Sequence, residues 1–155
     1  MLIGTLTSIL GTGCSDNLNG IDLNKQERST VDAFGRTLLW SKDEFDISAN
    51  GERIVNNEEK YIKGDEKVIN IQITYDGYTN ADTSTYVSQV SIFGDSESLY
   101  NETGEQYINR HHSLNFNIAN YNQVRFYIAL WCDGWEEYCS SATLKISNLK
   151  IYQIN

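Results

Sequence analysis

Hydrophobic side chains occupy every second position in several segments of this chain. The clearest is residues 68–75, where four large apolar side chains alternate with polar ones: Ile69, Ile71, Ile73 and Tyr75. The same two-residue period recurs in residues 114–118 and 124–130. Successive side chains of a strand point to opposite faces, so this period predicts half-buried antiparallel strands. We expect segments 114–118 and 124–130 to be adjacent strands joined by residues 119–122.

Weaker strand signals occur at residues 34–40, 54–62 and 86–93, separated by residue pairs typical of turns. These turns are predicted at Asn50-Gly51, Gly64-Asp65, Asp76-Gly77 and Gly94-Asp95.

The apolar pattern changes phase near the end of the chain. Ala142, Leu144 and Ile146 share one parity, whereas Leu149 and Ile151 share the other. A slip of one residue would turn the following side chains to the wrong face, so the pattern predicts a bulge or bend between residues 147 and 148.

Composition agrees with a fold made of strands and turns. Asn, Ser and Thr together number 41, whereas Ala occurs six times, which disfavours long helices. Seven or eight short strands exceed what one small sheet normally holds, so two facing sheets are expected. We therefore predict an all-β fold, an antiparallel β-sandwich of jelly-roll type.

Charge and length exclude several classes of protein. The net charge of −9 argues against a nucleic-acid partner and against docking on anionic lipid. No apolar run approaches the ~18 residues of a transmembrane helix. About a quarter of the 155 residues are Leu, Ile, Val or Phe, enough to bury one core.

Residues 1–25 differ in composition from residues 26–155, and we divide the chain there into an N-terminal arm and a β-sandwich domain. One interpretation is a lipoprotein signal ending at Cys14, because Gly13 precedes it and a polar segment follows. Against this, no Lys or Arg precedes Cys14, and Leu10 lies one position too far upstream for a lipobox. We favour an extended arm that packs on a neighbour or partner subunit.

Two cysteines bracket a short aromatic and acidic segment, residues 131–139. If the flanking strands pair, Cys132 and Cys139 face each other across a hairpin, and a disulfide would pin the loop between them. A pair of reduced thiols is the alternative in a cytosolic protein.

The same loop supplies the candidate ligand-binding residues, Trp135, Tyr138, Asp133 and Glu136. Aromatic rings pair with the C–H face of a sugar or with another protein, and carboxylates accept hydrogen bonds from hydroxyl groups. The structural alternative is that the aromatic rings pack the loop onto the sandwich and the acids are only solvated.

Metal sites and catalytic constellations have weaker support. His111 and His112 are consecutive, so in a strand they point to opposite faces, and no Cys or His lies at zinc-finger spacing. The run 76–82 offers three oxygen donors for a structural calcium ion but lacks the glutamate of an EF-hand. We expect no cofactor and no metal.

Three carboxylate pairs can be proposed for glycoside hydrolysis: Glu58-Glu59, Glu136-Glu137 and Asp43-Glu44. The chemistry needs two carboxyls about 5 to 9.5 Å apart across a cleft, one with a raised pKa, which adjacency in sequence does not provide. Nucleophile elbow, Walker loop and dinucleotide motifs are absent from the sequence. We expect a protein that is not an enzyme.

Two stretches resemble known proteins. Asp32-Ala33-Phe34-Gly35-Arg36 resembles the "DAFGR" phrase of tailed-bacteriophage virion structural proteins, although residues 37–40 depart from its usual "LRVS" continuation. Residues 142–152 are similar to the closing strands of jelly-roll carbohydrate-binding modules and phage adhesin modules. The resemblance implies a sandwich at the virion surface.

The expected function is therefore a fibre or decoration subunit that attaches through its N-terminal arm and displays the sandwich for host-surface or glycan binding. Its expected partners are other virion proteins, a cell-surface glycan and further copies of itself, for example in a trimer. The alternative is an exported bacterial carbohydrate-binding module or lipoprotein.

Overall fold

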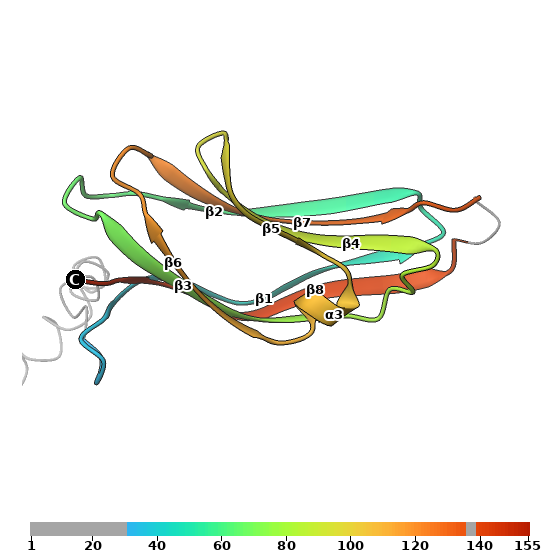
Figure 1. The fold of residues 1–155 in the computed structure, drawn as a ribbon, viewed down its shortest axis with the longest axis horizontal. Coiled ribbons are helices and arrows are strands. Elements are labelled where there is room, and N and C mark those ends of the chain that lie inside the picture. The colour runs from blue at the N-terminus through green and yellow to red at the C-terminus, as the bar shows by residue number, and fades with distance from the viewer. Residues whose placement is uncertain (1–30, 136–138) are drawn as a thin grey trace, which may run out of the picture.

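The computed structural model describes residues 31–135 and 139–155, which form two antiparallel sheets packed face to face (Figure 1). The strands are β1 (Thr37–Asn50), β2 (Ile54–Ile62), β3 (Asn70–Thr79), β4 (Tyr86–Gly94), β5 (Glu97–Thr103), β6 (His111–Asn117), β7 (Gln123–Cys132) and β8 (Ser141–Gln153). A short helix, α3 (Glu105–Ile108), connects β5 to β6. The predicted N-terminal arm, including Cys14, lies outside the described residues.

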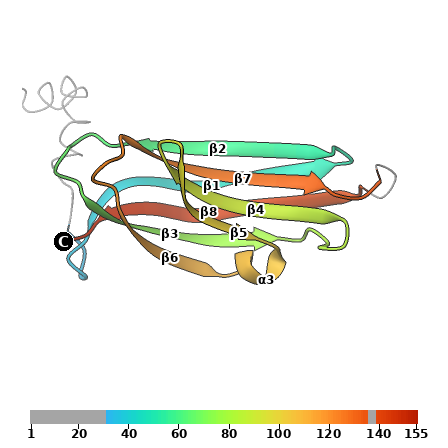
Figure 2. The same ribbon diagram turned by 45° about the horizontal axis from the view of Figure 1, so that its top comes forward.

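The strand order is β1-β8-β3-β6 in one sheet and β2-β7-β4-β5 in the other (Figure 2). Among the described strands, only β4 and β5 are consecutive in the chain and also neighbours in a sheet. The other connections cross from one sheet to the other, as in a jelly roll. The predicted fold class is confirmed.

This topology corrects two expectations about neighbouring strands. Segments 114–118 and 124–130 are not paired, because β6 and β7 belong to opposite sheets. Strands β7 and β8 also belong to opposite sheets, so Cys132 and Cys139 do not face each other across a hairpin. Local alternation reveals a strand's buried face, but pairing depends on contacts between distant segments.

The core lies between the alternating faces that the sequence predicts. Every apolar side chain of β7 at the predicted positions is buried: Val124, Phe126, Ile128 and Leu130. In β3, Ile71, Ile73 and Tyr75 are buried, whereas Ile69 precedes the strand and is exposed. The Phe126 ring makes edge contacts with Phe45 and Tyr75 at centroid distances of 5.8 and 4.9 Å. Each large apolar side chain buried here contributes about 1.5–3 kcal/mol before entropy is subtracted.

The predicted change of phase in β8 is confirmed as a bulge. Thr74 of β3 pairs with Lys150, whereas Asp76 pairs with Ser147, so β8 has one extra residue opposite Tyr75. Asn148 has a φ of 53°, a left-handed conformation that Asn tolerates better than most residues. The bulge keeps the apolar residues on both sides of it buried: Ala142, Leu144, Ile146, Leu149 and Ile151.

The expected turn at Asp76-Gly77 is wrong, because both residues lie within β3. Gly77 is required there for a different reason. A Cβ on Gly77 would lie 2.5 Å from the carbonyl oxygen of Ile108, so only glycine allows α3 to approach the strand this closely.

One strand has bounds that differ from expectation, and another strand was not expected. The segment predicted at residues 34–40 begins at Thr37 and continues to Asn50, and its second half buries Phe45, Ile47 and Ala49. Strand β5 was not predicted, since an edge strand with many exposed polar residues carries little periodic signal. In contrast, the predicted segment 54–62 coincides with β2.

Candidate functional site

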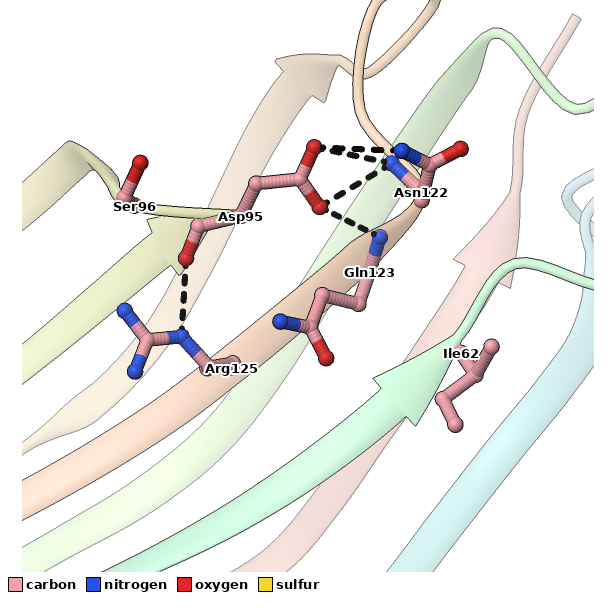
Figure 3. Close-up of a pocket in the computed structure, with 6 residues that line it drawn as sticks. All are labelled: Ile62, Asp95, Ser96, Asn122, Gln123 and Arg125. Atoms are coloured by element: carbon pink, nitrogen blue, oxygen red, sulfur yellow. Dashed lines mark hydrogen bonds between the residues drawn. The ribbon is translucent and has the colours of Figure 1, made fainter.

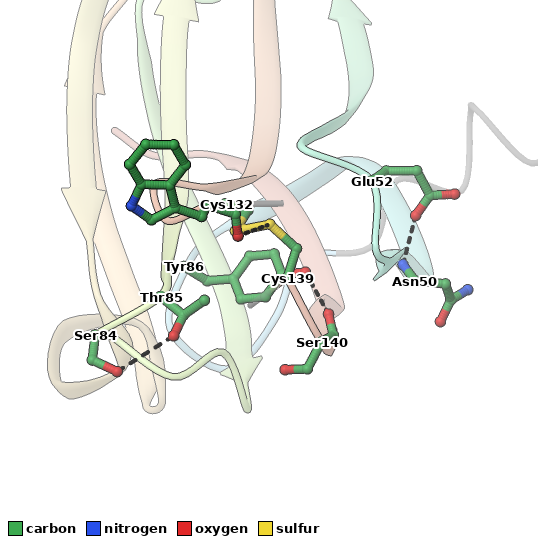
Figure 4. Close-up of a disulfide and its surroundings, with 9 residues drawn as sticks. Asn50, Glu52, Ser84, Thr85, Tyr86, Cys132, Cys139 and Ser140 are labelled. Carbon is green, nitrogen blue, oxygen red and sulfur yellow. Dashed lines mark hydrogen bonds between the residues drawn. A yellow bond between two sulfur atoms is a disulfide. The ribbon is translucent and has the colours of Figure 1, made fainter. Parts of the chain in front are cut away.

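A disulfide joins Cys132, the last residue of β7, to Cys139, which precedes β8 (Figure 4). The two Cα atoms are 5.8 Å apart. Because β7 and β8 belong to opposite sheets, the bond ties the sheets together at one end of the sandwich. It therefore closes the loop without the hairpin that the sequence suggested.

Hydrogen bonds hold the base of this loop against neighbouring connections. The backbone N–H of Cys132 donates to the carbonyl of Arg53 at 2.7 Å, and that of Asp133 donates to Thr85 at 2.8 Å. The hydroxyl of the buried Tyr86 donates to the carbonyl of Ser140 (Figure 4). Both ends of the loop are thus anchored to the folded body.

The structure places part of the predicted ligand-binding set at this end. Trp135 is 79% exposed, and Asp133 is also exposed. Glu136 and Tyr138 lie outside the described residues. Trp131 is half-buried on β7, where it pairs with Ile54 of β2 and Val87 of β4. Trp135 therefore does not pack onto the sandwich, and its indole is open to a ligand.

An exposed indole and an exposed carboxylate on the same loop, Trp135 and Asp133, have a specific chemical capacity. The ring can stack on the apolar C–H face of a sugar, and the carboxylate can accept a hydrogen bond from a hydroxyl group. An anchored loop loses less conformational freedom on binding than a free one.

The "DAFGR" phrase forms a tightly bonded turn before β1. One carboxylate oxygen of Asp32 accepts hydrogen bonds from the backbone N–H groups of Phe34 and Arg36, both at 2.9 Å. The other accepts from Arg36 Nε at 2.8 Å. The Arg36 side chain is the main cause that lowers the pKa of Asp32. Gly35 has a φ of 75°, which glycine adopts without strain.

The same turn holds an exposed phenyl ring. The Arg36 guanidinium lies over the rings of Phe34 and Tyr152, at 5.1 and 4.1 Å from their centroids, and donates to Gln72 at 2.5 Å. Phe34 is nevertheless 82% exposed. The sequence marked this segment only by resemblance; Asp and Gly three residues apart are a local signal for such a turn.

A hollow of about 570 Å³ lies beside the β4–β5 turn (Figure 3). The Asp95 carboxylate accepts from the backbone N–H of Asn122 and Gln123 at 3.1 and 3.0 Å. Arg125 Nε donates to the carbonyl of Asp95 at 2.8 Å. These bonds join the β4–β5 turn to the segment between β6 and β7, so we assign the cluster a structural role.

The two adjacent histidines point in opposite directions, as expected. His111 is exposed and its Nδ1 lies 2.8 Å from Asp76, whereas His112 is buried between the sheets. Within residues 31–135 and 139–155, no three His, Cys, Asp or Glu side chains gather closely enough to hold a metal ion.

The oxygen donors considered for calcium do not share a turn. Asp76 lies in β3, where its carboxylate accepts a hydrogen bond from the Asn148 side chain at 2.8 Å and a second oxygen bonds His111. Both interactions lower the pKa of Asp76. Asp82 instead accepts from the backbone N–H of Ser84 at 2.9 Å.

In both carboxylate pairs that the structure describes, at least one member forms a salt bridge with a basic side chain. Glu58 bonds Lys60 at 2.9 Å and Arg125 at 3.1 Å, and both lower its pKa. A general acid of a glycosidase requires the opposite shift. Glu44 is likewise paired, with Lys145 at 2.6 Å.

No protein-family model matches the chain, and no curated protein sequence is significantly similar to it. In the described part of the chain, no helix has the length and apolar character needed to cross a membrane.

Proposed function

We propose that this protein is a non-catalytic surface module that binds a glycan through its disulfide-closed loop. The observation that carries the proposal is the 79% exposure of Trp135 on a loop whose ends are tied to both sheets. A large apolar ring left in water has no structural benefit to the fold, but it suits stacking on a sugar.

Charge narrows the class of glycan. The protein carries a net charge of −9, and the exposed Asp133 lies two residues before Trp135 in the sequence. A polyanionic glycan would be repelled by this charge. We therefore propose a neutral saccharide as the ligand.

We further propose that the module is part of a virus particle. The resemblance of residues 32–36 to virion structural proteins supports a fibre or decoration subunit, anchored through residues 1–25. The disulfide favours the alternative of an exported bacterial module, because such bonds persist in oxidising compartments. Mass spectrometry of the native protein separates the two: an intact Met1 supports the virion subunit, and processing at or near Cys14 supports export.

A glycan array tests the binding function, followed by titration of the best neutral oligosaccharide. Trp135→Ala should lower affinity by roughly tenfold or more, and Trp135→Ala combined with Tyr138→Ala should abolish binding. Tyr78→Ala removes an exposed aromatic side chain of β3 and serves as the matched control. The melting temperature should hardly change in any variant. If the double variant unfolds, the rings belong to the core and the proposed site is wrong.

A further inference from the structure

Exposed hydrophobic side chains gather at the end of the sandwich opposite the disulfide. In the pairing of β2 with β7, Ile62 lies opposite Gln123 at the start of β7, whereas Ile54 lies opposite Trp131 at its end. Ile62 therefore lies far from Cys132. Five large apolar residues are exposed at or near this far end: Val31, Phe34, Leu38, Ile62 and Ile69. A concentration of this kind marks an interaction surface more often than single exposed residues do.

Phe34 is the most exposed of the five, and the turn that carries it is firmly held. Two backbone hydrogen bonds to Asp32, the Asp32–Arg36 ion pair of 2.7 Å and the contact of Arg36 with Tyr152 fix the turn that carries it. Because the backbone that carries the ring is already fixed, less conformational freedom is lost when the ring enters a pocket.

An apolar groove lies at the same end. Its volume is about 770 Å³, and it opens between the start of β1 and the end of β2. Apolar and aromatic side chains form much of its wall: Leu38, Leu39, Trp40, Tyr61, Ile62 and Val68. A cavity of about 150 Å³ with apolar walls already binds benzene, so this groove has ample room for a phenyl ring. Phe34 itself lines a different hollow, with Arg36, Gln72 and Ile154.

We propose that copies of this protein associate through this end, with Phe34 of one copy inserted into the groove of the next. This end is self-complementary, because it carries both the projecting Phe34 ring and an apolar groove with the volume to admit one. Such a contact closes as a two-fold dimer or as a ring such as a trimer. The disulfide-closed loops then lie away from the contact. This inference is independent of what Trp135 binds.

The test is the mass of the full chain in solution, by light scattering after size exclusion and by sedimentation at about 1–100 µM. The wild type should form a closed oligomer. Phe34→Asp, which removes the ring, and Ile62→Asp, which alters the groove wall, should each weaken association by roughly thirtyfold or more. Ile54→Asp makes the same change at a residue 69% exposed near the disulfide end and should leave the oligomer intact.

Circular dichroism and melting temperature establish that each variant is folded. A wild type that stays monomeric at 100 µM overturns the proposal, and would mean that another protein or residues 1–30 cover this end. An oligomer that survives Phe34→Asp also overturns it.

Discussion

Tyr75 of β3 and His112 of β6 are register partners whose rings stack, with centroids 4.3 Å apart and planes inclined by 5°. His112 Nε2 lies 3.1 Å from the carbonyl oxygen of Ile108, which can only accept, so Nε2 carries a proton. Nδ1 of the neutral ring therefore accepts from the Tyr100 hydroxyl at 3.4 Å. The result is a neutral histidine enclosed between the sheets.

Acid should destabilise the protein through His112. Burial lowers its pKa below the ordinary value of 6.5, despite the Glu102 carboxylate 3.6 Å from Nδ1. The unfolded chain then binds a proton at a pH where the folded chain does not, so this contribution to stability is present above about pH 6.5 and is lost as the pH falls below it.

Urea unfolding between pH 7.5 and 5.5 measures this effect. His112→Gln should be less stable than wild type throughout, but its stability should depend less on pH in this window. Equal slopes for wild type and His112→Gln would show that His112 is not the titrating group.

Removing the disulfide should destabilise the fold and weaken ligand binding together. For a loop this short, replacing Cys132 and Cys139 by Ser should cost about 2–3 kcal/mol of unfolding free energy. Glycan affinity should also fall, because the loop is no longer preorganised. Urea unfolding measures the first effect and calorimetric titration the second. A thiol count on denatured, unreduced protein checks the bond itself: one free thiol is expected, and three would exclude it.

The left-handed conformation of Asn148 in the bulge predicts that its substitutions destabilise the protein to different extents. Asn148→Gly keeps the left-handed conformation and loses only the hydrogen bond to Asp76, so it should cost about 1 kcal/mol or less. Asn148→Val also forces a β-branched residue into that conformation, and should cost about 1–3 kcal/mol in total. Thermal unfolding distinguishes them. Equal stability of the two variants would argue against a strained position.

A side chain at position 77 should clash where β3 contacts α3. Its added Cβ would meet a backbone oxygen at 2.5 Å, which cannot turn aside as a side chain can. Gly77→Ala should therefore destabilise the protein by about 2 kcal/mol or more. Gly64→Ala, where no atom lies within 4 Å of the new Cβ, should change stability by less than about 0.5 kcal/mol. Similar melting temperatures for both variants would contradict the contact.

Periodicity predicted the faces of the strands well because burial acts on each side chain locally. The alternation from Val124 to Leu130 and the change of phase after Ile146 both follow from keeping apolar groups between the sheets. The second half of β1 carries a weaker periodic signal. Phe45, Ile47 and Ala49 alternate with polar residues too, but the acids at 43, 44 and 46 weaken the apolar signal, and the predicted strand ended at residue 40.

The assignment of strands to sheets could not be predicted, because it depends on contacts between distant residues. Nothing local shows that β7 and β8 belong to opposite sheets, although this decides what the bond between Cys132 and Cys139 does. For the candidate site, cysteine spacing indicated the loop, whereas the exposure of Trp135 required the folded chain. The bonds that position Phe34 likewise combine a local turn with Gln72 and Tyr152, which are distant in sequence.

The disulfide-closed end, with Trp135, is the ligand-binding surface that we propose. The most direct test is NMR titration of the ¹⁵N-labelled protein with the neutral oligosaccharide that binds best on the array. The three tryptophans each give an indole N–H signal, and they lie at different places in the fold. We predict that the signals of Trp135 and of the Asp133 backbone shift in proportion to binding, while that of Trp40 stays fixed. Saturable shifts centred elsewhere, with the Trp135 signal unmoved, would contradict the claim.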